Sequence, residues 1–232
     1  MEKMIRISPT TGLNLFRNCP RCFWLHYNKK VKRPRGIFPS LPGGMDLVIK
    51  KYFDQYRGKV PPEIKGKAEG CLMPDVDLMN KWRNWRTGLE YHDKELDAVL
   101  FGALDDCLIE DDPSAGSGQT YYIPLDYKTR GSAPNEGDSE RYYQTQLDAY
   151  SLLLSANSYK TTNYAYLVYY YPEEVKEDGI VEFNIKHVRV ETNLERANNT
   201  FRDAVKLLKG PIPERYSSCE YCCFISDRLG FE

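Results

Sequence analysis

The segment YYIPLDYKT, residues 121–129, decides the fold that we expect for this chain. Its tyrosines, isoleucine and leucine favour a β-strand, and the segment also carries two charged residues, Asp126 and Lys128. Because alternate side chains of a strand point to the same face, this carboxylate and this ammonium are expected to point to one place. Such a pair suits a hard cation beside a polyanion, although a single D-x-K triplet can also be a surface ion pair.

A second carboxylate precedes this strand. The partner strand, predicted over Leu96–Ile109, contains GALD at residues 102–105, and a polar loop over Glu110–Thr120 joins the two strands. Two converging carboxylates, completed by water molecules, are a usual way for proteins to hold Mg²⁺. Asp105 together with the D-x-K triplet is therefore a more specific signal than either feature alone. The combination predicts a metal site.

The rest of the chain predicts an α/β (α+β) fold, with a central mixed, mostly antiparallel β-sheet flanked by helices in a single domain over residues 1–232. Within it we expect a basic N-terminal helical arm over 1–36, a core with the metal site over 96–190, and a cysteine tail over 211–232. Hydrophobic periodicity and helix-breaking residues give the other expected elements. Helices are predicted over Leu13–Lys30 (divided at Pro20), Met45–Arg57, Asp75–Arg86, Asp138–Ala156 and Asn193–Lys209. A loop is predicted over Lys29–Pro42, and strands over Tyr164–Tyr171 and Ile180–Val190.

The total charge conceals an asymmetry. The chain has 32 Lys and Arg against 33 Asp and Glu, a net charge of −1, yet nine basic residues and one acid lie within residues 1–36. Acids dominate Asp105–Asp112 instead. A basic arm beside an acidic centre is typical of an enzyme that holds a polyanion and a metal, and a solvated helix face beside an acidic loop is the alternative. We expect polyanion contacts from Arg17, Arg21, Lys29 and Lys30.

Two tryptophans, Trp82 and Trp85, lie three residues apart in a predicted helix that also carries basic side chains. At this spacing they either stack on nucleic-acid bases or pack in the core, and core packing is the commoner use. The sequence leaves both readings open.

The composition excludes two classes of protein. With 41% hydrophobic residues, the chain is not expected to be disordered, and no apolar run reaches the length of a membrane span. The opening MEKMIRISPT lacks the apolar stretch of a secretory signal. We therefore expect a cytoplasmic protein without membrane contacts.

Four of the seven cysteines form two CxxC pairs at opposite ends of the chain, Cys19 with Cys22 and Cys219 with Cys222, and Cys223 follows directly. Two such pairs supply the four thiolates that a tetrahedral zinc ion or an iron–sulfur cluster needs. If they meet, they clasp the N- and C-terminal segments together. The alternative is four small buried thiols that stay apart.

The ordered motifs GALDD, PLDYKTRG and QLDAY, which start at residues 102, 124 and 146, resemble the PD-(D/E)XK nuclease superfamily. Within it they resemble the RecB-like branch related to the CRISPR-associated adaptation exonucleases. The resemblance implies a restriction-endonuclease-like core in which Asp105 and Asp126 bind the metal, helped by the backbone carbonyl of Tyr127. It also implies that Lys128 is the catalytic lysine and that Gln146 and Tyr150 form the branch's QxxxY motif.

The same resemblance implies two cofactors, Mg²⁺ or Mn²⁺ at the carboxylates and a four-iron four-sulfur cluster at the cysteines, with zinc as the alternative. Two features depart from the relatives. They place a histidine ligand at the start of the helix where this chain has Asp46, which either takes that ligand position or caps the helix. Their last cysteine comes several residues after the CxxC, so either Cys22 or the adjacent Cys223 completes the set here.

The sequence therefore predicts a Mg²⁺- or Mn²⁺-dependent deoxyribonuclease, an exonuclease in particular, with DNA as its partner. The resemblance places it in DNA processing, repair or recombination, or CRISPR-type adaptation. A catalytically silent DNA-binding or assembly subunit with the same fold is the main alternative. A structural protein clasped by zinc is a third.

Overall fold

Two β-sheets form the framework of the computed structural model, which describes residues 4–34, 36, 40–111 and 118–229. The larger sheet contains one parallel pair, β6 with β7, and antiparallel pairs elsewhere. Its strands in spatial order are β2 (Cys71–Leu72), β5 (Asp106–Asp111), β6 (Thr120–Thr129), β7 (Tyr164–Val175) and β8 (Val181–Glu191). The smaller sheet has the order β1 (Ile5–Ile7), β4 (Ala98–Gly102) and β3 (Leu89–Asp93). This mixed sheet with flanking helices confirms the predicted fold class.

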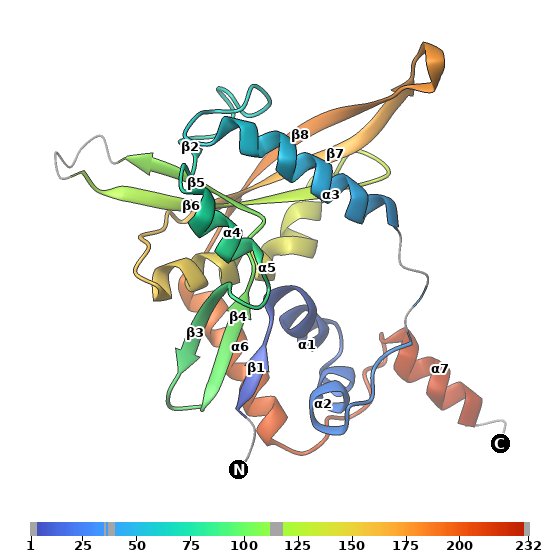
Figure 1. Cartoon of the computed structure of the whole chain (residues 1–232). Coiled ribbons are helices and arrows are strands. Elements are labelled where there is room, and N and C mark those ends of the chain that lie inside the picture. The colour runs from blue at the N-terminus through green and yellow to red at the C-terminus, as the bar shows by residue number, and fades with distance from the viewer. Residues whose placement is uncertain (1–3, 35, 37–39, 112–117, 230–232) are drawn as a thin grey trace.

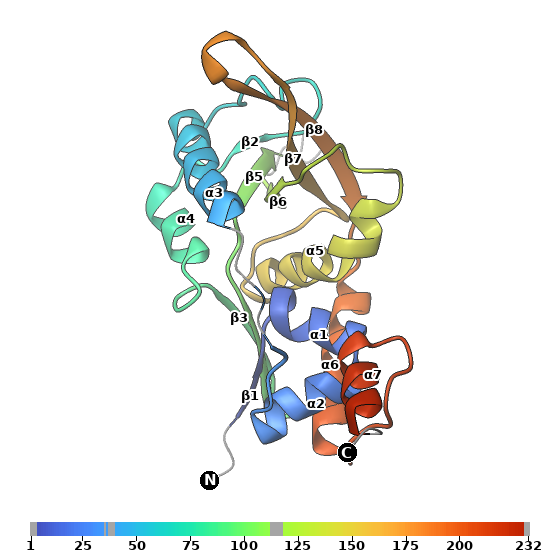
Figure 2. The same ribbon diagram turned by 90° about the vertical axis from the view of Figure 1, so that its right-hand side faces the viewer.

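The parallel pair requires a crossover connection, and α5 (Asp138–Ala156) provides it. This helix has the bounds that the sequence predicts. Its contacts reach the larger sheet, the smaller sheet and the last long helix, α6 (Leu194–Lys209). In Figure 2, α5 lies between the larger sheet above and a lower group that contains the smaller sheet.

The two faces of the larger sheet have different coverings. On one face, α3 (Ser40–Phe53) packs Ile49 and Phe53 against Leu125 and Tyr127 of β6. Leu153 and its neighbours in α5 belong to the other core, together with alternate residues of β7. Figure 1 shows α3 lying across the strands of the larger sheet. Because β6 alternates, its residues 126 and 128 face away from the α3 core.

The expectation of one strand over Leu96–Ile109 is wrong. The chain leaves the smaller sheet after Gly102 and joins the larger one at Asp106. Between the two strands, the Leu104 amide donates to the carbonyl oxygen of Trp82 (3.1 Å) and the Asp105 carbonyl accepts from Arg83 Nε (2.8 Å). Both hydrogen bonds go to α4 (Val76–Arg83) rather than to a neighbouring strand. The chain therefore bends at Ala103–Asp105, between the two sheets.

The helices near the N-terminus divide as the sequence predicts. A π-helical turn, η1 (Pro9–Leu13), leads into α1 (Asn14–Asn18), and α2 (Pro20–Lys29) follows. Cys19 is extended (φ −163°) and caps α2, whose first residue is Pro20. Proline is tolerated there because the first helical amide has no partner within the helix.

Helix α3 begins five residues earlier than predicted, so the expected loop over Lys29–Pro42 is wrong for its last three residues. Pro42 fits because the first amides of a helix need no intrahelical acceptor. Residues 35, 37–39 and 112–117 lie outside the described residues, and with them part of this loop and of the polar loop over Glu110–Thr120. The remaining elements are η2 (Asp54–Tyr56), α4 (Val76–Arg83), η3 (Glu177–Gly179) and α7 (Glu220–Leu229).

The C-terminal segment returns to the N-terminal helices, as α7 and α2 lie near each other in both views (Figures 1 and 2). Among the described helices, none combines the length and the apolar character that crossing a bilayer requires. The division into an arm over 1–36, a core over 96–190 and a tail over 211–232 stays a prediction.

The role of α5 in joining the two sheets predicts a large effect of a cavity in it. Leu153 is fully buried, so Leu153→Ala should lower the free energy of unfolding by about 2–5 kcal/mol. Leu47→Ala, at a side chain of α3 that is 63% exposed, is the control and should stay within about 0.5 kcal/mol of the parent. Urea denaturation followed by circular dichroism measures both, and equal losses would contradict the placement of α5.

Candidate active site and cysteine cluster

Two carboxylates meet at the bend between the sheets. Asp105 lies directly before β5 and Asp126 lies on β6, close enough for their side chains to interact. The Asp126 side chain is 1% exposed and that of Asp105 is 24% exposed. Lys128, two residues along β6, forms an ion pair with Asp126 Oδ2, as the shared face of the strand predicts.

Helix α5 supplies two further polar groups. Gln146 Nε2 donates to Asp126 Oδ1 (2.7 Å) and to the hydroxyl oxygen of Tyr150 (2.8 Å). Residues four apart share a face of a helix, and here that face points to the carboxylates. Asp105, Asp126, Lys128, Gln146 and Tyr150 thus form one connected cluster from three parts of the chain.

Lys50 of α3 joins this cluster, and the sequence reasoning missed it. Its ammonium donates to Asp105 Oδ1 (2.8 Å) and to Asp46 Oδ2 (2.9 Å). Asp46 therefore reaches the cluster through Lys50, one helical turn away. The helix-cap alternative for Asp46 is wrong because α3 begins at Ser40. The spacing of Asp46 and Lys50 was a visible signal for their ion pair, but nothing local linked Lys50 to Asp105.

Burial and charge separate the two carboxylates electrostatically. Burial raises the pKa of Asp126 to about 7, with Lys128 opposing the shift and Asp105 adding to it. Burial would also raise the pKa of Asp105, but Lys50 and Lys128 outweigh it and the net shift is downward. Among the described residues, Asp126 Oδ2 has the Lys128 ammonium as its ion-pair partner and accepts no further hydrogen bond. A buried carboxylate oxygen beside a second carboxylate fits a hard divalent cation.

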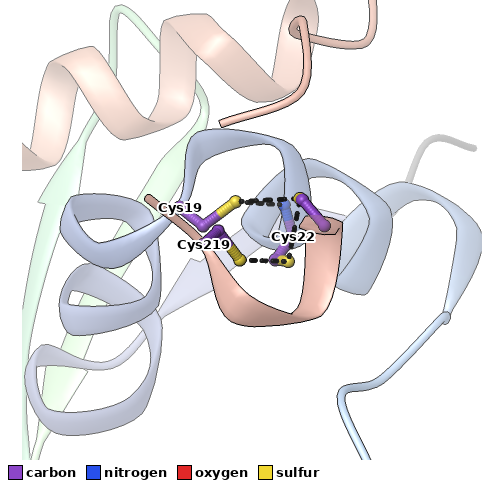
Figure 3. Close-up of side chains that lie close together, drawn as sticks. Cys19, Cys22 and Cys219 are labelled. Carbon is purple, nitrogen blue, oxygen red and sulfur yellow. Dashed lines mark hydrogen bonds between the residues drawn. The ribbon is translucent and has the colours of Figure 1, made fainter. Parts of the chain in front are cut away.

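The two CxxC pairs meet at the far end of the molecule. The sulfur atoms of Cys19, Cys22, Cys219 and Cys222 all lie within 4.8 Å of one another. Figure 3 shows the side chains of Cys19, Cys22 and Cys219 close together. Three separations are short: 3.7 Å for Cys19–Cys222, 3.7 Å for Cys22–Cys219 and 4.0 Å for Cys22–Cys222. Cys223 is not in this group, and its thiol lies against the carbonyl oxygen of Ser217 (3.1 Å).

Residues 46–226 match the family model of the PD-(D/E)XK nuclease superfamily. The chain belongs to this superfamily. Its members are generally nucleases, which use divalent metals, typically Mg²⁺, and act on DNA. The matched residues include the whole carboxylate cluster but not Cys19 and Cys22. No curated protein matches the chain.

In this member of the superfamily, a buried ion network holds the bend that carries Asp105. The neighbouring Asp106 is fully buried and accepts from Arg57 Nη1 and Nη2 (2.7 and 2.6 Å) and from Arg83 Nη2 (2.8 Å). The Tyr127 hydroxyl donates to the same carboxylate (2.7 Å). Because Arg83 also bonds the Asp105 carbonyl, the network fixes the residue next to it. The sequence showed Asp106 only as one acid of a run.

The four basic residues that we expected to contact DNA all have partners within the chain. Arg17 Nη1 donates to Thr145 Oγ1 (2.6 Å), beside Gln146, and Arg21 Nη1 donates to the Pro213 carbonyl (2.7 Å). Lys29 lies over the Trp24 ring, and Lys30 Nζ donates to the Tyr27 carbonyl (2.7 Å). Of these, only Arg17 lies next to a residue of the cluster. Their contact with DNA stays a prediction.

Loss of the Asp106 charge should destabilise the protein strongly. Asp106→Asn leaves two largely buried guanidinium groups with too little negative charge, so the free energy of unfolding should fall by about 3–5 kcal/mol. Asp203→Asn is the control, because Asp203 is 63% exposed and its ion pair with Lys206 is long (3.7 Å). Its loss should be at most about 1 kcal/mol. Guanidinium denaturation curves measure the two, and an Asp106→Asn curve that overlays the parent would contradict the network.

Proposed function

We propose that this protein is a DNA nuclease, an exonuclease in particular, that depends on Mg²⁺ or Mn²⁺. One observation carries the proposal: Asp105, Asp126, Lys128, Gln146 and Tyr150 are linked by ion pairs, hydrogen bonds and close approach into one cluster. A DNA-binding module has no need of a buried carboxylate beside a lysine, so the cluster supports catalysis over a silent subunit. Membership of the RecB-like branch and a role in repair, recombination or CRISPR-type adaptation remain predictions.

Asp105 and Asp126 would hold the metal, with the backbone carbonyl of Tyr127, and Asp46 is a further proposed ligand. Carboxylate and carbonyl oxygens are the donors that Mg²⁺ and Mn²⁺ prefer. When bound, such an ion lowers the pKa of a coordinated water and polarises a phosphoryl oxygen. Gln146 donates to Asp126 Oδ1 while Lys128 pairs with Oδ2, so the amide orients the carboxylate in which a bound cation would compete with the lysine.

Lys128 would act on the substrate. Its ammonium lies 4.7 Å from the centre of the Tyr143 ring and forms an ion pair with Asp126, so it is held between α5 and β6. From there it can orient the attacking water or offset negative charge that builds on the phosphate. Burial alone would lower the pKa of Lys128, but Asp126 and Asp105 raise it, which keeps the side chain cationic.

We further propose that the four cysteines hold one zinc ion rather than a four-iron cluster. A tetrahedral zinc site with Zn–S bonds of about 2.3 Å places its sulfur atoms about 3.8 Å apart. Three of the sulfur separations, at 3.7–4.0 Å, match that spacing, and all of them stay within 4.8 Å. A four-iron cluster binds each thiolate to a different iron atom, so it holds the four cysteine sulfur atoms farther apart.

Substitution of the lysine tests the catalytic proposal. Lys128→Ala and Asp126→Ala should each lower the cleavage rate of end-labelled DNA by about 10²–10³-fold or more, because the first removes the cation beside the phosphate and the second a proposed metal ligand. Lys160→Ala is the matched control, since this lysine bonds the Gln119 side chain near the start of β6. It should cleave like the parent. The assay is denaturing gel electrophoresis with Mg²⁺, with Mn²⁺ and with EDTA.

Cleavage that persists in Lys128→Ala, or that continues in EDTA, would reject the proposed mechanism. DNA binding by the parent protein without cleavage in either metal would favour the silent subunit instead.

Metal analysis tests the cysteine proposal. Protein purified without oxygen should be colourless and contain one zinc ion per chain by elemental analysis. Cys19→Ser should lose that zinc, and Cys223→Ser, whose thiol lies outside the group, should keep it. A brown protein with iron and acid-labile sulfide would overturn the assignment.

A further inference from the structure

A pocket opens beside the proposed active site, and the hydrolysis described above does not use it. Its volume is about 310 Å³, at the lower end of the range for ligand pockets. Its walls combine hydroxyl groups of η1 with aromatic side chains, and the lining residues used below are Thr11, Trp85, Phe101 and Tyr150.

The pocket and the metal site share one side chain. Tyr150 lines the pocket, and its hydroxyl oxygen accepts from Gln146, which in turn donates to Asp126. Ala103, another lining residue, lies two positions before Asp105. A group that enters the pocket is therefore next to the phosphate that the carboxylates and Lys128 would bind.

The structure shows that the two tryptophans have different environments, which the sequence did not distinguish. Trp82 is 1% exposed and packs edge-on against Tyr159 at 4.8 Å, so it belongs to the core. Trp85 is 67% exposed and lines the pocket. The Arg86 guanidinium lies 5.0 Å from the centre of the Trp85 ring. An exposed indole beside a cation is the arrangement on which unpaired bases stack.

A second hollow continues from the first. It has a volume of about 510 Å³, shares Thr10 and Thr11 with the pocket and extends along α1 and α2 to Lys32 and Arg33. Asn14 and Asn18 are among its lining residues. Amide and cationic groups in this order suit the sugar-phosphate chain that adjoins a stacked base. The aromatic and polar parts thus follow each other as the base and the backbone of one strand would.

We propose that Trp85 and the pocket hold an unpaired base of the DNA strand that is cut, next to its scissile phosphate. The adjoining backbone then runs over η1 towards Lys32. A base within a duplex cannot offer its face to Trp85, so the site selects single-stranded DNA or frayed ends. This inference rests on the proposed nuclease function and adds the substrate class to it.

Binding in EDTA tests the base site without cleavage. Fluorescence anisotropy compares a labelled oligothymidylate with a labelled blunt hairpin duplex. Trp85→Ala should weaken binding of the single strand by about 5- to 150-fold, the effect of one lost stacked base, and should not change duplex binding. Trp85→Phe should restore most of the affinity. Phe224→Ala is the matched control, because this ring on α7 is 65% exposed and lies outside the pocket.

Abasic substitutions place the stacked base on the strand. A series of oligonucleotides carries one abasic site at successive positions. The parent should bind one member of the series more weakly than the intact strand, and Trp85→Ala should bind that member and the intact strand equally. The single strand should also quench the fluorescence of the parent, and Trp85→Ala should lose that quenching although Trp24 and Trp82 remain.

Three results overturn the inference: equal single-strand affinity of Trp85→Ala and the parent, equal losses on single strand and duplex, or a similar loss with Phe224→Ala. Each leaves the catalytic proposal standing. Retained cleavage by Lys128→Ala rejects the catalytic proposal and does not affect this comparison. Absence of single-strand binding by the parent in EDTA also overturns the base site, and the cleavage assay with metal still decides the catalytic proposal.

Discussion

The buried carboxylate of Asp106 is the constraint on which the active-site region depends. It binds two guanidinium groups and a tyrosine hydroxyl, so it ties the residue after η2, the end of α4 and strands β5 and β6 to one point. A charge this deeply buried is tolerated only when its partners are in place. The bend between β4 and β5 is therefore fixed, and Asp105 projects from it towards β6. These two adjacent aspartates have opposite surroundings: Asp106 lies among arginines in the core, and Asp105 lies at the proposed metal site.

Helix α5 is the second positioning element. It makes the crossover between the parallel strands β6 and β7, and the same helix packs on the smaller sheet and on α6. Gln146 and Tyr150 are therefore presented by a helix whose position the core determines. A loop would hold the Asp126 carboxylate less rigidly. The hydrogen bonds from Gln146 show how a core element can orient a charged group that the active site needs.

The cysteine cluster constrains the chain on a larger scale. Cys22 and Cys219 are about 200 residues apart in sequence, yet their sulfur atoms lie 3.7 Å apart. A metal at this point would close nearly the whole chain into one loop, and the entropy of closing such a loop is removed mainly from the unfolded state. The α2 helix, which Cys19 caps and which contains Cys22, adjoins the polar hollow that continues from the Trp85 pocket. The clasp and the proposed DNA path thus meet on the same helices.

Local patterns in the sequence were sufficient for several features. The two-residue period of a strand placed Asp126 and Lys128 on one face, and the turn of a helix placed Gln146 beside Tyr150. The bounds of α5 and the division at Pro20 followed from helix-forming and helix-breaking residues, and the ordered motifs indicated the superfamily. All of these depend on residues a few positions apart, whose relative directions the backbone geometry fixes.

Other features required the folded chain. The bend at Ala103–Asp105, the contact of Lys50 with Asp105 and the burial of Asp106 among arginines join residues 22 to 55 positions apart. Trp82 and Trp85 have the same local signature, and only the packing around α4 decides that one is buried and the other exposed. Side-chain type and spacing specify which groups can point the same way. The packing of distant segments decides which of these groups meet and how deeply they are buried. That packing sets the distances and the local dielectric, and a metal site or a base site requires both.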